Sequence, residues 1–331
     1  MKEFKVTKQN EGQRFDKYLS RILNKGSMSF IYKMLRKKNF VLNDKKATGK
    51  EILNEGDIVK LYISDDTYNK FKTDSVLEKN ITIRENVNIK DRIVYEDKDI
   101  ILINKPANLL SQKAKKEDIS LNEYIINYLF SSGYLNEENI INYKPAVINR
   151  LDRNTTGIVI VCKNLKAAQI LSMSLKTRDI NKYYKCLVKG KFTKEGLHEG
   201  YLSKDKSTNI VTVTSEKING DCDLIQTEYK LLEYKNDTSL VSVHLITGKS
   251  HQIRAHMAYL GFPIIGDNKY GDRKLNIELN KKYQLLHAYK IVFPEYEDEL
   301  LFDFSGKTFF CEPDFNLSWQ VKNGDMENKR T

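Results

Sequence analysis

Residues 149–162 read NRLDRNTTGIVIVC and join a charged loop to an apolar run. The last five residues, 158–162, are too few for a stable helix and rich in β-branched side chains, so they predict a buried strand. Just before them, Asp152 lies between Arg150 and Arg153 and precedes a Thr-Thr-Gly turn. Opposite charges nearby favour an ionised carboxylate, which suits nucleophilic or electrostatic work. On composition alone, an aspartate that caps its own turn is the simpler interpretation.

The chain on both sides of this stretch mixes short strands with helices and shows no regular alternation of parallel βαβ units. It contains no repeat and no glycine-rich phosphate-binding motif. We therefore expect an α+β fold with a mixed, mainly antiparallel β-sheet and flanking helices. The predicted helices are 120–130, 167–176 and 250–260, and the predicted strands are 92–95, 100–103, 158–162, 183–188, 208–214, 227–232, 240–245 and 285–293.

A second segment whose side chains could take part in catalysis or binding is TGKSHQIRAHM, residues 247–257. A helix that begins near Ser250 would direct its free N–H groups toward the preceding glycine turn, with Gln252 and Arg254 on its first turn. His251 and His256 are five residues apart, a spacing that does not place two metal ligands on one helical face. We therefore predict no metal site here. The next residues, GFPIIGD, predict an ordered turn.

The net charge of +11 over 331 residues is unevenly distributed. Residues 1–65 hold 15 Lys and Arg against 8 Asp and Glu, whereas the rest of the chain is nearly balanced. A small basic module supplies sequence-independent affinity for nucleic acid, although a Lys-rich composition can also serve solubility alone. Apolar spacing predicts two helices in this module, over residues 15–23 and 29–38, with Ser29 as an N-cap. Strands are predicted to follow them.

The boundaries of the predicted parts follow from changes in composition. Residues 64–90 lose periodicity and are rich in Asp, Asn, Lys and Thr, which is typical of a tether. We expect a small basic RNA-binding domain over residues 1–65, a linker over 66–90, a catalytic domain over 91–312 and a C-terminal tail over 313–331.

Composition also excludes several classes of protein. No apolar stretch approaches the ~20 residues that a membrane span requires. The first five residues, MKEFK, carry charge where a secretory signal is apolar, so we expect a cytoplasmic protein. The four cysteines, at 162, 186, 222 and 311, form no close pair, which predicts reduced thiols and no metal knuckle.

Residues 12–64 resemble the small RNA-binding domain named after ribosomal protein S four. The resemblance is carried by four motifs, RFDKYL (14–19), SFIYKMLR (29–36), VLNDKK (41–46) and GDIV (56–59). It implies that the two helices present a basic face to structured RNA. The residues expected on that face are Arg14, Lys33, Arg36 and Lys37.

Over about residues 12–310 the chain resembles the RluA-type family of pseudouridine synthases, which acts largely on large-subunit ribosomal RNA. Several motifs occur in the order of that family: NKP (104–106), RLD with Gly157 (150–157), KYYKCLV (182–188), TG with HQIR (247–254) and LHA (286–288). The resemblance implies that uracil is detached at N1, rotated and rejoined through C5. No group enters or leaves, so neither a cofactor nor a metal is expected.

The resemblance also implies roles for individual residues. Asp152 would be the catalytic carboxylate, Arg254 its orienting partner, and Tyr184 the residue that stacks on the base and takes the C5 proton. Leu286 would form the pocket floor. Arg150 would fill the space that the flipped base vacates, with a salt bridge to Asp152 or a phosphate contact as alternatives. Further RNA contacts are expected from Lys249, His251 and Gln252.

Some positions depart from the family pattern: Asn149, Thr156, Lys249, Asn108 and the pair Ser111-Gln112. None removes a catalytic atom, so we expect them to affect target choice more than activity. Two other functions are open, a non-catalytic ribosome-binding protein that kept the fold and a glycosidase that hydrolyses the bond. The glycosidase would require a positioned water and a second carboxylate. The expected partner is ribosomal RNA, bound by a monomer without a membrane or a metal.

Overall fold

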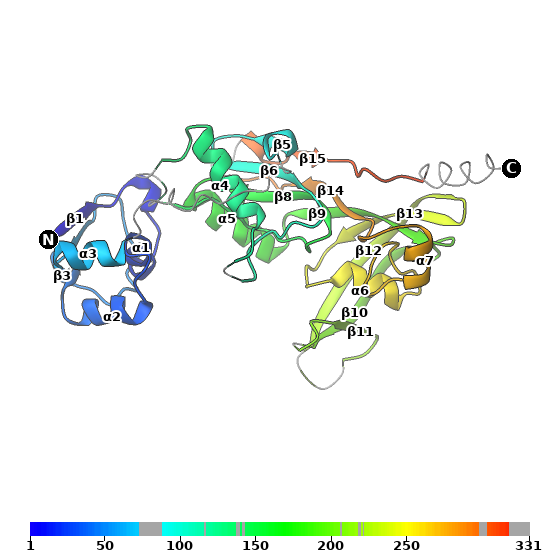
Figure 1. Cartoon of the computed structure of the whole chain (residues 1–331), viewed down its shortest axis with the longest axis horizontal. Coiled ribbons are helices and arrows are strands. Elements are labelled where there is room, and N and C mark those ends of the chain that lie inside the picture. Colours follow the sequence, from blue (N-terminus) through cyan, green and yellow to red (C-terminus); the bar gives the residue numbers. More distant parts are fainter. Residues whose placement is uncertain are drawn as a thin grey trace.

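The described residues fold into two units, each built on its own β-sheet (Figure 1). No described helix is long and apolar enough to span a lipid bilayer. The structure is a computed structural model that describes residues 1–72, 88–115, 117–136, 140, 143–205, 207–217, 220, 222–297 and 303–317.

The N-terminal unit contains a four-stranded antiparallel sheet in the order β1-β4-β2-β3, with helices packed on it. Its core includes the buried side chains of Phe15, Ile31 and Phe40, as the apolar spacing predicts. Helix α2 begins earlier than predicted, because Ser27 and not Ser29 accepts the capping hydrogen bond from Phe30 N. The elements are β1 (Lys2–Lys5), α1 (Phe15–Ile22), α2 (Met28–Arg36), β2 (Phe40–Leu42), β3 (Lys45–Lys46), β4 (Ile58–Leu61) and α3 (Asp65–Phe71).

Helix α3 extends this unit beyond the predicted boundary at residue 65. Ser64 caps the helix, and Tyr68 is buried in the same core as Phe15. Phe71 packs on Phe30 with the ring centroids 4.2 Å apart. The predicted linker therefore does not begin at residue 66, because an apolar face there packs on the first core. Most of the remaining linker, residues 73–87, lies outside the described residues.

The larger domain is built on a mixed sheet of eleven strands. Its order is β11-β10-β12-β13-β9-β14-β8-β6-β5, with β15 paired to β14 and β7 to β8. Among the named strands of this sheet only β14 and β8 pair in parallel within the described residues, which confirms the predicted α+β class. The strands are β5 (Ile93–Glu96), β6 (Ile100–Lys105), β7 (Ala146–Val147), β8 (Thr156–Cys162), β9 (Asn181–Lys189), β10 (Gly196–Lys204), β11 (Val211–Thr214), β12 (Cys222–Lys235), β13 (Thr238–Leu245), β14 (Leu286–Val292) and β15 (Thr308–Phe310).

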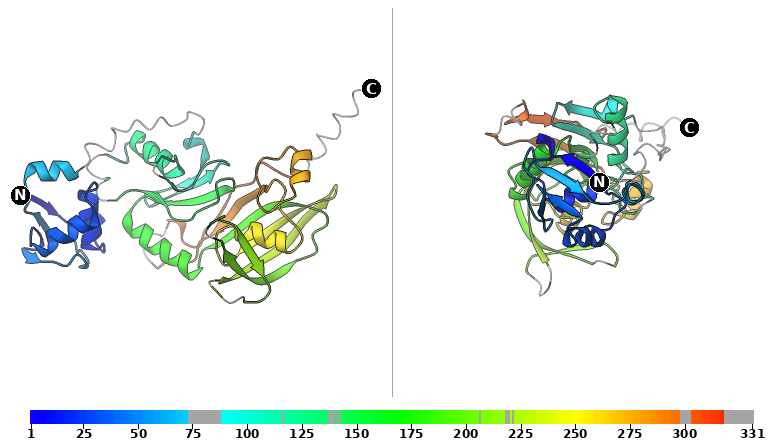
Figure 2. Two further views of the ribbon diagram at one scale, coloured as in Figure 1. Left: turned by 60° about the horizontal axis from the view of Figure 1, so that its bottom comes forward. Right: turned by 90° about the vertical axis from the view of Figure 1, so that its left-hand side faces the viewer.

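Helices cover both faces of the sheet around β8 (Figure 2). Val159 and Val161 pack in the core that contains α4, whereas Ile158 and Ile160 pack in the core that contains α5. Because successive strand residues face opposite sides, a strand buried on both faces reads as an unbroken apolar run. The helices of this domain are α4 (Leu121–Ser131), α5 (Leu165–Thr177), α6 (Gln252–Tyr259) and α7 (Arg273–Glu278).

The parallel contact between β14 and β8 depends on a glycine. Gly157 has φ +108°, and a Cβ atom built on it would lie 2.3 Å from the carbonyl oxygen of Ala288. No side chain fits at that distance, and the backbone conformation itself favours glycine. The close approach brings the loop of Asp152 next to residues 286–288, more than a hundred positions later in the chain.

The end of the domain also differs from the prediction. Leu317 is buried in a cluster with Leu187 and Ile265, and Phe315 packs against that cluster. Residues 313–317 therefore belong to the domain and not to a separate tail. Residues 318–331 lie outside the described part of the chain.

Candidate active site

A cleft of about 910 Å³ opens where the loop before β8 meets β9, β14 and the start of α6. Among the described residues that line it, Asp152 is the single acidic one. Such a wall attracts a polyanion and leaves one carboxylate in a positive field. Nine of the described lining residues are lysines or arginines: Lys113, Arg150, Arg153, Lys176, Arg178, Lys182, Lys204, Lys249 and Arg254.

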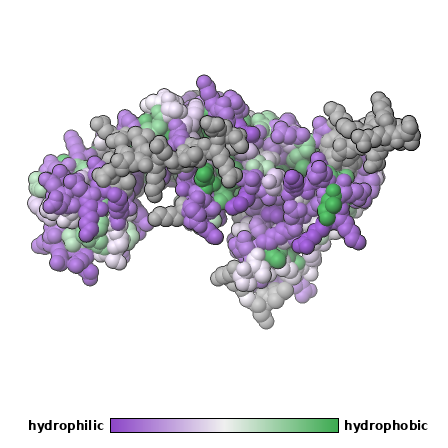
Figure 3. Space-filling view, in the orientation of Figure 1, coloured by the Kyte–Doolittle hydropathy of each residue, from purple (hydrophilic) through white to green (hydrophobic). Residues whose placement is uncertain are grey.

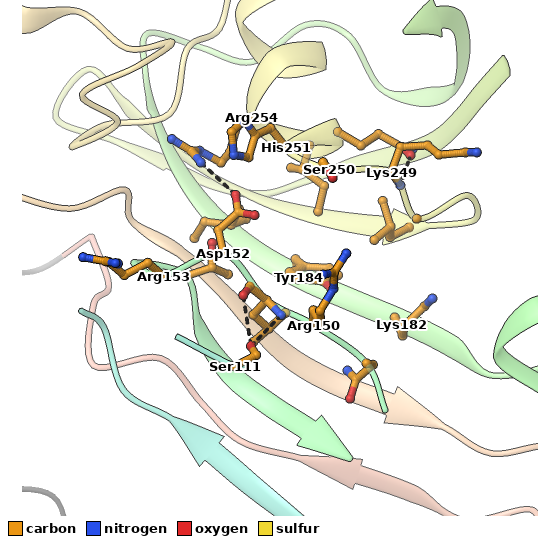
Figure 4. A pocket seen from close by; sticks show the side chains of 18 of the residues that line it. Ser111, Arg150, Asp152, Arg153, Lys182, Tyr184, Lys249, Ser250, His251 and Arg254 are labelled. Atoms are coloured by element: carbon orange, nitrogen blue, oxygen red, sulfur yellow. Dashed lines mark hydrogen bonds and ion pairs between the residues drawn. The ribbon is translucent and has the colours of Figure 1, made fainter. Parts of the chain in front are cut away.

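Asp152 and Arg254 form an ion pair across the cleft, with 2.7 Å between Asp152 Oδ2 and Arg254 Nη1 (Figure 4). The two residues are 102 positions apart in the chain, so the fold alone brings them together. Arg254 lies on the first turn of α6, as predicted. The side chain of Asp152 keeps 27% of its surface exposed, which leaves it accessible to a ligand in the cleft.

Asp267 holds the other side of the Arg254 guanidinium. Its two carboxylate oxygens accept hydrogen bonds from Arg254 Nε at 2.7 Å and from Nη2 at 2.9 Å. It also accepts the backbone N–H groups of Lys269 and Tyr270, and it is fully buried. Burial opposes ionisation, but the hydrogen bonds and charge of Arg254 outweigh it and lower the pKa of Asp267. The guanidinium is therefore fixed between two carboxylates.

No role for Asp267 could be predicted from the sequence, because the pattern GFPIIGD indicates only a turn. Nothing in the local spacing shows that this carboxylate turns inward toward a helix that ends several residues earlier. Its pairing with Arg254 is visible only in the folded chain.

Three of the departures from the family pattern brace the loop of Asp152. Ser111 Oγ accepts a hydrogen bond from Leu151 N at 3.1 Å and donates one to Leu151 O at 3.0 Å. Asn149 Oδ1 accepts the N–H of Ile160 at 2.6 Å. Thr156 Oγ1 lies 2.7 Å from a ring nitrogen of His287. These side chains hold the protein backbone, so we no longer expect them to set target choice through RNA contacts.

Lys105 supports the same loop from beneath. Its ammonium group is fully buried and donates to the carbonyl oxygens of Pro106, Leu109 and Arg153 at 2.9, 2.9 and 3.0 Å. Burial lowers the pKa of Lys105 to about 7, although the nearby charge of Asp152 opposes this shift. The residue belongs to the predicted NKP motif, but the sequence did not show that it holds the residue next to Asp152.

The pKa of Lys105 predicts a pH-dependent contribution to stability. In the folded protein Lys105 loses its proton above about pH 7, whereas in the unfolded chain it keeps the proton to about pH 10.5. The cost of burying the charge is thus fully present below pH 7 and is relieved as the pH rises. We expect the free energy of unfolding of wild type to increase relative to Lys105→Met by up to ~1.4 kcal/mol per pH unit across that window.

Urea denaturation of both proteins between pH 6 and about 10 measures this difference. Lys189→Met, at the exposed end of β9, is the control and should follow wild type at every pH. Parallel curves for wild type and Lys105→Met would contradict the prediction.

Tyr184 and Leu286 lie in the cleft as predicted. Tyr184 is on β9 and Leu286 is on β14, and both side chains are buried. Burial raises the pKa of Tyr184, with the charge of Asp152 as a second cause. The phenol therefore stays protonated near neutral pH, which suits packing against a base better than accepting its proton.

Gln252 lies at the cleft but contacts other protein groups. Its oxygen accepts hydrogen bonds from Thr247 Oγ1 and Lys249 N, both at 3.0 Å. Its nitrogen donates to Gln226 O and Thr227 Oγ1. An amide has two donors and two acceptor positions, so all are used within the protein. The prediction that Gln252 contacts RNA is therefore replaced by a structural role.

Lys249 and His251 line the cleft with partners of their own. Lys249 Nζ pairs with Asp223 at 2.6 Å, and His251 Nδ1 lies 2.8 Å from the hydroxyl of Tyr270. His251 has φ +56° and directly precedes α6, so the helix begins at Gln252 and not near Ser250. Both side chains remain at the cleft wall, where a ligand can reach them.

Arg150 is exposed and lines the same cleft as Tyr184 (Figure 4). Among the described residues, the ion pair of Asp152 is made with Arg254 and not with Arg150. The alternative of an Arg150–Asp152 salt bridge is therefore wrong, and the Arg150 side chain faces the ligand space.

The predicted basic face of the N-terminal unit is largely that of α2. Lys33, Arg36 and Lys37 are exposed there, on a unit whose surface is mostly hydrophilic (Figure 3). Arg14 instead pairs with Asp16 through Nη2 and Nε, at 2.6 and 3.2 Å. Its charge is therefore compensated within the protein.

Within the described ranges no group of three or more His, Cys, Asp and Glu side chains could hold a metal ion.

Comparison with known proteins places this chain in a family. Residues 99–259 match the family model described as RNA pseudouridylate synthase. Human RNA pseudouridylate synthase domain containing 4 has the same fold, with a TM-score of 0.55 and 20% identity over 69% of this chain and 90% of that one.

Two bacterial relatives extend the match along nearly the whole chain. An RNA pseudouridine synthase of Mycoplasma genitalium is 33% identical over 300 residues, which cover 89% of this chain and 90% of the relative. The ribosomal large subunit pseudouridine synthase C of Rickettsia bellii is 33% identical over 283 residues, 84% of this chain and 89% of the relative. Identity of this extent shows that the protein is an RNA pseudouridine synthase and belongs to the RluA-type family.

Proposed function

We propose that the protein converts uridines of large-subunit ribosomal RNA to pseudouridine without a cofactor, with Asp152 as the catalytic carboxylate. The observation that carries the proposal is a single carboxylate, paired with Arg254, in a cleft whose other charged lining residues among those described are lysines and arginines. Cleavage of a glycosidic bond calls for a carboxylate near the anomeric carbon. The names of relatives that act on the large ribosomal subunit support the substrate.

The reaction needs no external reactant. The bond from C1′ to N1 breaks, the uracil rotates, and a bond from C1′ to C5 forms, while a proton leaves C5 and N1 gains one. Asp152 acts at the junction of sugar and base, and Arg254 holds its carboxylate in place through a directional charge-assisted hydrogen bond. Tyr184 packs on the base, and Leu286 forms the floor beneath it.

Hydrolysis by a glycosidase is the less suitable function for this cleft. That chemistry uses two carboxylates on opposite sides of the bond, one of which activates a water or attacks the sugar. Asp267 is the nearest second carboxylate to Arg254, but it is fully buried behind the guanidinium and both of its oxygens accept hydrogen bonds. It therefore cannot reach a water in the cleft.

Access of the uridine to Asp152 requires that the base leave its stack, at a cost of a few kcal/mol. We propose that the exposed side chain of Arg150, which lines the same cleft as Tyr184, enters the vacated space. The N-terminal unit, which resembles the S-four RNA-binding domain, would add affinity through α2. Contacts from Lys33, Arg36 and Lys37 to phosphates would anchor the RNA without reading the reacting base.

Mapping of carbodiimide-blocked uridines in ribosomal RNA tests the proposal. RNA from cells that lack the protein should lose one or more pseudouridines of the large subunit. A plasmid with the wild-type protein should restore them, whereas Asp152→Asn should not. An unchanged set of pseudouridines in the cells without the protein would refute the proposed substrate.

A further inference from the structure

Two cations meet at the end of the cleft formed by the C-terminus of α5 and the start of β9. Arg178 directly follows α5, and Lys182 is the second residue of β9; both line the cleft. Figure 4 shows Lys182 on the same side as Arg150 and Lys249, away from the Asp152–Arg254 pair. The described residues provide no ion pair or hydrogen bond to the ammonium group of Lys182.

Two other lysines of the cleft wall are compensated by carboxylates. Lys249 pairs with Asp223 at 2.6 Å, and Lys113 lies 3.5 Å from Glu123. Lys182 instead has Arg178 as its charged neighbour. Burial is the larger cause that lowers the pKa of Lys182, and the like charge of Arg178 adds to it. A protein that partly desolvates one cation beside another gives up stability unless an anion joins them.

The backbone of Arg178 provides a second, independent observation. Arg178 ends α5 with φ +70° and ψ +24°, the left-handed conformation in which glycine is the usual residue. A residue with a Cβ atom costs about 1 kcal/mol there. The chain thus keeps a long cationic side chain at a position where a glycine would be more stable, as is common at functional sites.

We propose that Lys182 and Arg178 form a phosphate site, which binds a backbone phosphodiester of the substrate RNA next to the flipped uridine. The proposal rests on the proposed function, since it requires that the base pack on Tyr184. Lys182 and Tyr184 are two positions apart on β9, so their side chains share one face of the strand about 7 Å apart. That separation places the cation within reach of a phosphate of the same or the adjacent nucleotide.

A phosphodiester would also compensate the positive charges of Lys182 and Arg178. Its negative charge removes the repulsion between the two cations, and its oxygens accept the ammonium and guanidinium N–H groups in charge-assisted hydrogen bonds. Arginine suits the two oxygens with paired donors, whereas lysine acts as a point charge. The site would recognise the RNA backbone and contribute to position more than to base identity.

The test uses the full chain in the Asp152→Asn background, so that binding is measured without turnover. The probe is a transcript of large-subunit ribosomal RNA, and its affinity is measured over a series of salt concentrations. Affinity falls as salt rises, so the slope of log affinity against log salt is negative. Lys182→Gln and Arg178→Gln should each reduce the magnitude of this slope by ~0.7 to 0.9, and the double variant should reduce it by about twice that. Lys189→Gln, at the exposed end of the same strand and outside the lining of the cleft, removes the same charge and should leave the slope unchanged.

Two further measurements separate this role from a structural one. In the active background, release of tritium from RNA that contains [5-³H]uridine should show a KM that rises more than kcat falls. Because Lys182→Gln removes an uncompensated cation, its midpoint of thermal unfolding should equal or exceed that of wild type, whereas a structural lysine would give a lower one.

An unchanged salt slope in the double variant would overturn the proposal. So would a lower unfolding midpoint together with unchanged binding. The binding measurement needs no turnover, so it tests the phosphate site by itself. Absence of tritium release by wild type would instead refute the isomerase function.

Discussion

Asp152→Asn is expected to abolish pseudouridine formation, with kcat below ~10⁻³ of wild type and RNA affinity changed by less than about threefold. The amide has the same shape, and its oxygen can still accept from Arg254 Nη1, so the cleft keeps its form. It carries no negative charge and cannot act as a nucleophile, a base or an electrostatic stabiliser at the sugar. Tritium release from [5-³H]uridine RNA and filter binding measure the two quantities.

The matched control is Asp237→Asn, which makes the same change in the exposed turn between β12 and β13. Asp237 has φ +52°, a conformation that asparagine adopts at least as well, so activity and stability should both stay at the wild-type level. If Asp152→Asn retained more than about a tenth of the wild-type kcat, Asp152 would not be the catalytic carboxylate.

Asp267→Asn is expected to reduce both stability and turnover, although Asp267 does not line the cleft. Removal of one partner of a buried ion pair costs about 3–5 kcal/mol, because the remaining charge stays desolvated. Arg254 would also lose the anchor that directs Nη1 toward Asp152. We expect kcat to fall by ~10²-fold with a smaller change in KM, since misplacement of a catalytic group by about 1 Å has effects of that size.

Asp267→Asn should also change how the free energy of unfolding depends on pH in the acid range. The pKa of Asp267 is depressed in the folded protein, so its contribution to stability is present above its unfolded pKa of 3.8 and is lost as the pH falls through the lower folded value. The difference in unfolding free energy between wild type and Asp267→Asn should therefore narrow below about pH 4. Urea denaturation over a pH series measures it.

A suitable control for this variant is Asp272→Asn. Asp272 caps α7 by accepting from Lys274 N and Leu275 N, and asparagine caps helices about as well as aspartate. Its substitution should leave stability and kcat near wild type. Equal stability of Asp267→Asn and Asp272→Asn would show that the buried Asp267–Arg254 pair contributes nothing to the free energy of unfolding.

The elements that the sequence predicted well have strong local signals. Strand β8 is an unbroken β-branched run because it is buried on both faces. Helix α4 begins with a capping box, Ser120 and Glu123, before its apolar face. Strand β10 was not predicted, because residues 196–204 (GLHEGYLSK) contain two glycines and no regular alternation of apolar and polar side chains. Its position is determined by pairing with β12 on one side and β11 on the other.

The site was predictable only where a motif carried it. Asp152, Arg254, Tyr184 and Leu286 were identified through the family resemblance, and the fold brings all four to one cleft. The residues that support them were not identified, because support depends on distant contacts. Lys105 bonds to the carbonyl of Arg153 from 48 positions away, and no local pattern records such a contact.

The position of β14 in the sheet determines when the two halves of the sheet can pair during translation. Among the described strands, the half-sheet of β5, β6 and β8 and the half-sheet of β9 to β13 are joined through β14, the segment Leu286–Val292. Asp152 belongs to the first half-sheet and Arg254 follows the second, so no described strand pairing joins the two parts before β14 is synthesised. We therefore expect the Asp152–Arg254 ion pair to form only after β14 has entered the sheet.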